Sequence, residues 1–125
     1  MLFTTALKKN FEFRRLYRRG KCAAGPCVAV YCLKNGRGAN RLGIAAGTKL
    51  GNAVKRNLVR RRIRESYRLC EHRVMPGFDI VVSARGRSVC SDFSDIDHDI
   101  KKQLSRLGLL KPEDADCSAS DTRTP

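Results

Sequence analysis

Residues 78–84, with the sequence FDIVVSA, constrain the fold more than any other segment of the chain. Three successive branched apolar residues, Ile80, Val81 and Val82, favour a strand, because branched side chains fit a pleated backbone. Successive side chains of a strand point to opposite faces of its sheet. An unbroken apolar run therefore predicts a strand that is buried on both faces.

Three segments have the apolar spacing of amphipathic helices. They are residues 10–20, 52–72 and 92–107. Asn10 and Asn52 are predicted to cap the first two helices, and Gly108 is predicted to end the third. Acidic residues crowd the N-terminal half of the third helix, where they suit the helix dipole. These residues are Asp92, Asp95, Asp97 and Asp99.

Two further extended segments, residues 27–33 and 41–46, flank the turn signal Asn35-Gly36 and are predicted to pair as a hairpin. Residues 21–24 are an additional candidate strand. The resulting order, α-β-β-(β)-α-β-α, predicts an α+β fold with helices packed on a single-layer sheet. We expect one domain over residues 1–111 and a disordered acidic tail over residues 112–125.

The net charge of +14 calls for a polyanionic partner, because such a charge opposes compaction of an isolated chain. Nearly all of it lies in residues 8–21 and 49–68. Nucleic acid, an anionic membrane surface and an acidic protein are the candidate partners. No apolar run is long enough to span a membrane, and no signal peptide precedes the basic residues, so we expect a cytoplasmic protein.

The helix predicted at residues 52–72 separates its side chains into two faces. Its core-facing stripe comprises Val59, Ile63, Ser66, Tyr67 and Cys70. Its cationic arc comprises Arg56, Asn57, Arg60, Arg61, Arg64 and Arg68. Like charges four residues apart repel by about 0.2–0.5 kcal/mol per pair, so such an arc predicts contact with phosphate groups. Arginine is also the cation best suited to bidentate phosphate binding and to stacking on bases.

The six cysteines and two histidines form no recognisable metal or disulfide pattern, since C-x-x-C pairs and ligand spacings are absent. We expect reduced thiols, with Cys27, Cys32 and Cys70 as small residues of the core. A self-sufficient nuclease would need a clustered acid/base or metal-binding set, and none can be assembled from this sequence. We therefore predict no catalytic and no metal-binding residue.

Residues 51–65, GNAVKRNLVRRRIRE, resemble the signature of the protein subunit of bacterial ribonuclease P, in which a loop and helix carry K-R-N-R-x-[KR]-R-x-x-R-E. Residues 13–20 are similar to the family's F-x-x-[VL]-[FY]-x-x-G, and the resemblance extends over residues 7–110. Leu58 departs from the signature, because it stands where the family has the second arginine of Arg-Asn-Arg. Either the contact made by that arginine is missing here, or Arg62 supplies it.

The resemblance implies an RNA-binding subunit that joins ribonuclease P RNA, one protein per catalytic RNA, and assists removal of the 5′ leader from precursor tRNA. Mg²⁺ ions bound mainly by the RNA would perform the chemistry, with the protein stabilising the ribozyme and its metal ions. The family fold implies an unusual left-handed β-α-β crossover around the basic helix, an exception to the right-handed rule.

Two sets of binding residues follow from the resemblance. Those expected to bind the catalytic RNA are Lys49, Asn52, Lys55, Arg56, Asn57, Arg60, Arg61, Arg64 and Arg68. Those expected to bind the leader, between the first helix and the sheet, are Phe13, Arg14, Arg15, Tyr17, Arg18 and Tyr31. Aromatic rings and cations suit a single strand, whose bases stack while its phosphates follow the charges. The helical stripe that contains Phe13 is equally consistent with a core position.

Three alternatives share some of these features. A small ribosomal protein would share the charge and the arginine helix but need no single-strand cleft. A helix-turn-helix regulator of DNA is disfavoured, because a hairpin and not a helix precedes the basic helix. An independent nuclease would cleave RNA without a partner.

Overall fold

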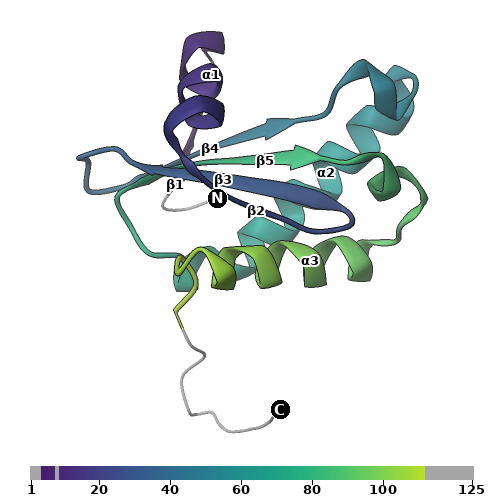
Figure 1. Ribbon diagram of the computed structural model, residues 1–125. Coiled ribbons are helices and arrows are strands. Elements are labelled where there is room, and N and C mark those ends of the chain that lie inside the picture. Colours follow the sequence, from purple (N-terminus) through teal and green to yellow (C-terminus); the bar gives the residue numbers. More distant parts are fainter. Residues whose placement is uncertain (1–3, 8, 112–125) are drawn as a thin grey trace, which may run out of the picture.

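A computed structural model describes residues 4–7 and 9–111, which form one sheet and three α-helices (Figure 1). The strands are β1 (Thr4–Ala6), β2 (Lys21–Ala24), β3 (Val28–Lys34), β4 (Asn40–Ala45) and β5 (Phe78–Ala84). The helices are α1 (Asn10–Arg19), α2 (Ala53–Cys70) and α3 (Phe93–Arg106). The predicted α+β class is confirmed, and the tail predicted at residues 112–125 lies outside the described residues.

Strand β5 lies at the centre of the sheet, whose order is β1-β4-β5-β3-β2. It pairs antiparallel with β3 and parallel with β4, so that Ile80 faces Cys32 on one side and Leu42 on the other. The predicted hairpin of β3 and β4 is therefore wrong. A strand buried on both faces is stabilised by pairing at both edges, and β5 takes the place between the two strands that are neighbours in sequence.

Helix α2 connects β4 to β5 as a parallel crossover, whose left-handed sense stays a prediction. The short strand predicted at residues 21–24 is confirmed as β2, which pairs with β3. Strand β1 was not predicted, because three residues are too few for a periodic pattern. It pairs parallel with β4 at the edge of the sheet.

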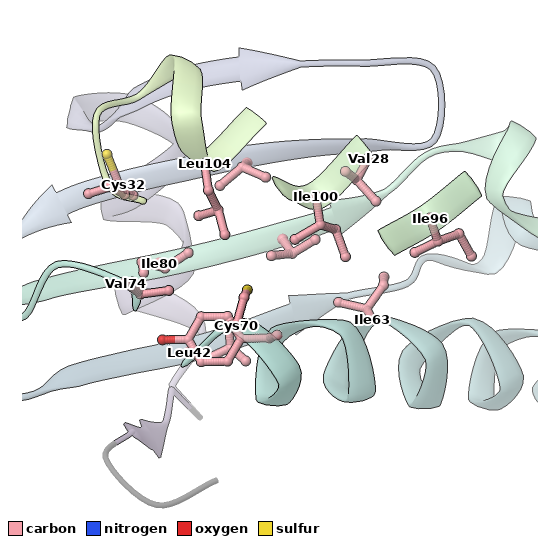
Figure 2. Packing of buried hydrophobic residues seen from close by; sticks show 14 of the residues in the cluster. Val28, Cys32, Leu42, Ile63, Cys70, Val74, Ile80, Ile96, Ile100 and Leu104 are labelled. Atoms are coloured by element: carbon pink, nitrogen blue, oxygen red, sulfur yellow. The ribbon is translucent and has the colours of Figure 1, made fainter. Parts of the chain in front are cut away.

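Helices α2 and α3 cover one face of the sheet and α1 lies on the other (Figure 1). Between α2, α3 and the sheet lies the larger hydrophobic core, which includes Ile63, Ile80 and Ile100 (Figure 2). The predicted core stripe of α2 is confirmed in full, since its buried residues are the five named above. The smaller core under α1 is built around Leu16 and Val81.

The predicted cap of α2 is confirmed, because the Asn52 side chain accepts a hydrogen bond from the Lys55 backbone N–H at 3.0 Å. The predicted cap of α1 is wrong. The Lys9 carbonyl already accepts backbone hydrogen bonds from the first turn, so Asn10 lies inside the helix. The side chain of Lys9 makes no capping hydrogen bond to the described residues.

Asp99, which the sequence places among the acids in the N-terminal half of α3, is a buried structural carboxylate, a role that the sequence pattern did not predict. It is 3% exposed and accepts hydrogen bonds from the backbone N–H groups of Cys27 and Val28, at 2.9 and 3.0 Å. Gln103 donates to its other oxygen at 2.9 Å. A Cβ at Gly25 would lie 2.1 Å from this carboxylate, so the turn between β2 and β3 needs glycine there. Asp99 thus fastens that turn to α3.

Replacing Asp99 should therefore destabilise the fold. We expect Asp99→Ala to lower the free energy of unfolding by at least about 1–3 kcal/mol, because buried donors lose their acceptor. Urea denaturation would measure the loss. Asp95→Ala, at an exposed position of the same helix, is the matched control and should cost less than about 1 kcal/mol. Equal losses in the two variants would contradict the assigned role.

Candidate nucleic-acid interface

The residues predicted to bind catalytic RNA lie on α2 and on the 3-10 turn (Thr48–Leu50) that leads into it. Helix α2 therefore carries most of the residues predicted to bind the catalytic RNA. Arg56 and Arg60 are half-buried. The remaining members are exposed: Lys49, Asn52, Lys55, Asn57, Arg61, Arg64 and Arg68.

Hydrogen bonds orient two side chains of this surface. Arg60 reaches the Ala46 carbonyl at 3.5 Å and the Asn57 side-chain oxygen at 3.4 Å, which directs its guanidinium towards the end of β4. The side-chain oxygen of Asn52 is occupied by the helix cap. These contacts place the Arg60 side chain beside the loop between β4 and α2.

The cationic arc is only partly neutralised by acids. Arg68 forms an ion pair with Glu65 at 2.5 Å, and both side chains are about half exposed. Such surface pairs stabilise proteins little. Arg56, Arg60 and Arg64 form no ion pair with the described residues. Three arginines on one side of α2 thus keep their charge available for an anionic partner.

The residues predicted to bind the leader meet on the other face of the sheet. The rings of Tyr17 from α1 and Tyr31 from β3 lie 4.9 Å apart at 77°, an edge-to-face pair. Burial raises the pKa of Tyr17, and a hydrogen bond with Ser83 of β5 only partly offsets this effect. Burial also raises the pKa of Tyr31, with a smaller contribution from neighbouring Cys22. Both phenols are therefore neutral at physiological pH and bring no negative charge towards RNA.

Phe13 is partly buried and packs with Leu16 in the smaller core. Its ring lies over Gly43 of β4, where a Cβ would come within 2.5 Å of a ring carbon. This close approach explains the glycine in the middle of a strand. Arg14, Arg15 and Arg18 are exposed on α1. The structure thus places Phe13 under the helix and the three arginines in solvent.

Arg41 of β4 fastens α1 to the sheet, a role that the sequence pattern did not predict. Its guanidinium bonds Glu12 of α1 at 2.5 Å and Asp79 of β5 at 2.7 Å. Burial alone would raise the pKa of Asp79, but hydrogen bonds from Arg41 and Asn35 hold it below its usual value. The signal in the sequence was Glu12, the one acid in the basic stretch at residues 8–21. Because Glu12 is engaged by Arg41, it does not neutralise the neighbouring arginines of α1.

Comparison with known proteins relates the chain to a single family. The family described as Ribonuclease P matches residues 3–108. A ribonuclease P protein component of Clostridioides difficile (strain 630) is 43% identical, over 85% of this chain and 94% of that protein. The structure of the Staphylococcus aureus RNase P protein is similar with a TM-score of 0.78 and 32% identity, over 85% of this chain and 97% of that one. The RNase P protein from Thermotoga maritima gives a TM-score of 0.74 and 30% identity, over 81% and 96% of the two chains.

The chain belongs to the bacterial ribonuclease P protein family. The family predicted from residues 51–65 and 13–20 is confirmed. Members of this family are the protein subunit of a ribonucleoprotein endoribonuclease that acts in 5′ maturation of precursor tRNA, and so is this chain. Family membership favours the ribonuclease P subunit over the ribosomal and DNA-binding alternatives.

Among the described residues, the other chemistry-bearing side chains are dispersed. The described part of the chain has no group of three or more His, Cys, Asp or Glu residues that could hold a metal ion. Cys27, Cys32 and Cys70 are buried free thiols, and Cys22 and Cys90 are exposed free thiols. None of the helices among residues 4–7 and 9–111 is long and apolar enough to cross a membrane.

Arg62, the candidate to supply the contact of the family arginine that Leu58 replaces, makes a hydrogen bond within the protein. Arg62 donates to the Ser91 carbonyl at 2.7 Å, across from α2 to the segment before α3. Leu58 is 38% exposed and presents an apolar surface instead. Arg62 is therefore held by a part-buried hydrogen bond at a position away from the cationic arc.

Arg62 and Arg64 should consequently respond in different ways to truncation. Arg62→Ala leaves the buried Ser91 carbonyl without its donor and should lower the free energy of unfolding by about 1–3 kcal/mol. Arg64→Ala, at an exposed position, should leave it within about 0.5 kcal/mol of the parent value. Denaturant titration of both proteins checks this, and a larger loss in Arg64→Ala would refute it.

Proposed function

We propose that the chain binds ribonuclease P RNA through the cationic arc of α2 and the 5′ leader of precursor tRNA through α1 and the adjoining sheet face. The observation that carries this proposal is the pair of arginine-rich surfaces on helices that cover opposite faces of one sheet. Each surface has its own chemistry, since only the α1 side adds a tyrosine pair.

The α2 surface suits a folded RNA. Arg56, Arg60 and Arg64 lie one turn apart, so their guanidinium groups can follow a series of phosphates. Their like charges repel when the helix is alone, and a phosphate backbone would remove that repulsion. Release of counterions on binding would add affinity that falls steeply with salt.

The α1 surface suits a single strand of variable sequence. Neutral phenol rings offer faces and edges on which any base can stack, for about 1–3 kcal/mol per base. Arg14, Arg15 and Arg18 can follow the backbone without reading bases. Leaders differ from one precursor tRNA to the next, and this chemistry tolerates that difference.

The chemistry of cleavage is assigned to the RNA and its Mg²⁺ ions, which would activate water and stabilise the leaving oxygen. The carboxylates of residues 4–7 and 9–111 are dispersed and form no cluster of three or more ligands that could hold a metal ion. The chain's own residues bind and orient the RNA: α2 stabilises the folded ribozyme and the metal ions that it holds, and α1 positions the leader.

We further infer that one protein binds each catalytic RNA, that the protein is cytoplasmic, and that the crossover through α2 is left-handed.

Reconstitution tests the proposal. The protein should stimulate leader removal by bacterial ribonuclease P RNA at low magnesium, and the protein alone should not cleave. Absence of stimulation would reject the proposal, and cleavage without RNA would place catalytic residues on the protein.

Reversing one charge of the α2 surface should weaken assembly. We expect Arg64→Glu to reduce affinity for ribonuclease P RNA and to lower the slope of log K against log[salt] by about 0.7–0.9 for each phosphate that the variant no longer neutralises. Filter binding across a salt series measures both quantities. Arg37→Glu, the same charge change at an exposed position between β3 and β4, is the control. An equal slope change in the two variants would show that α2 is not part of the RNA interface.

Removing the ring of Tyr17 should affect only substrates that carry a leader. Tyr17→Ala should weaken holoenzyme binding of precursor tRNA by about five-fold or more, the equivalent of at least one base-stacking interaction, and leave leaderless tRNA unchanged. Tyr17→Phe keeps the ring and should retain most of the affinity. Equal losses for substrates with and without a leader would argue against the leader surface.

A further inference from the structure

Phe11 is the most exposed aromatic side chain described in this protein, with 56% of its surface accessible. It lies on the side of α1 opposite to Leu16, which is 1% exposed and packs on the sheet. A single exposed apolar residue is common on protein surfaces and needs no explanation alone. The residues around Phe11 are what indicate a function for this side chain.

The ring of Phe11 borders a groove of about 710 Å³ that is lined by Arg14, Tyr17 and Arg18. Arg14 and Arg18 follow Phe11 at positions i+3 and i+7 and share its side of the helix, whereas Tyr17, at i+6, lies about 120° round the helix towards the sheet. The ammonium group of Lys9 lies 5.8 Å from the centre of the Phe11 ring. Two aromatic rings and two arginines therefore line one groove on the outer side of α1, and the Lys9 ammonium group lies beside the Phe11 ring.

Tyr17 belongs both to this groove and to the sheet face beneath it. Its ring contacts Tyr31 of β3, as described above, and it also lines the groove beside Phe11. The surface from Tyr31 to Phe11 is thus continuous through Tyr17. A strand that leaves the tyrosine pair would therefore meet the groove at Tyr17.

We propose that the outer groove of α1 binds a second stretch of the same single-stranded RNA, with a base stacked on Phe11 and phosphates held by Arg14 and Arg18. This inference rests on the proposed function and extends it, because it adds a stacking residue beyond Tyr17 and Tyr31. The leader would therefore be contacted on two sides of α1.

The charge around the groove favours RNA over a protein partner. Glu12, the acid of α1, is held by Arg41 on the sheet side, so the groove keeps its positive charge. An unpaired base can present its face to an exposed ring, whereas a base in a duplex is already stacked on its neighbours. These two features point to a single strand.

The test uses the reconstituted holoenzyme and precursor tRNAs with short and long leaders, together with leaderless tRNA. Phe11→Ala and Phe11→Leu should each weaken binding of the long-leader substrate by about five-fold or more, the equivalent of one base-stacking interaction. Phe11→Trp, which keeps a stacking face, should bind like the parent. Short-leader and leaderless substrates should bind equally well to all variants.

Two controls distinguish a loss of binding in the outer groove from a loss of the fold and from failure of the proposed leader surface. Met75→Ala removes another exposed apolar side chain, 38% accessible and distant in sequence from α1, and should change nothing. Unchanged melting of the Phe11 variants shows that the fold is intact. If Phe11→Ala binds every substrate like the parent while Tyr17→Ala still discriminates, the outer groove is rejected and the leader surface stands. A loss that extends to leaderless tRNA would also overturn the single-strand assignment.

Discussion

The position of β5 between β3 and β4 is the constraint on which the rest of the molecule depends. Its apolar residues are divided between two cores: Ile80 and Val82 belong to the core under α2 and α3, and Val81 belongs to the core under α1. Its first half also supplies Asp79, the carboxylate that holds Arg41 and through it α1. A strand that is paired at both edges and covered on both faces leaves the helices as the outer surfaces.

In the proposed function, that arrangement assigns different partners to the surfaces of α1 and α2. Helix α2 buries its apolar stripe in the core and directs a row of arginines outward, which suits a structured RNA. Helix α1 buries one side on the sheet, is fixed there by Glu12, and combines exposed arginines with aromatic rings, which suits a flexible strand. Because α1 and α2 lie on opposite faces of the sheet, the proposed function has the catalytic RNA and its substrate bound on opposite sides of the protein.

The sequence predicted which helices carry the residues of the candidate site. The charge pattern of residues 49–68 and the family signature located the α2 surface, and the helical stripe of α1 located its aromatic residues. The structure refined the individual residues: Phe13 packs over Gly43, Arg68 pairs with Glu65, and Arg62 bonds Ser91. Phe11 was overlooked because helical spacing shows which side chains share a face but not how much of a lone ring stays exposed.

The sequence by itself determined the local elements, since periodicity, caps and charge act over a few residues. It predicted the buried stripe of α2, the Asn52 cap, and the strands β2 and β5. Only the tertiary structure decided which strands pair, where the three residues of β1 lie, and why Asp99 is buried. Those features join residues far apart in the chain, where a partner is chosen by hydrogen-bond satisfaction and shared burial and not by any local pattern.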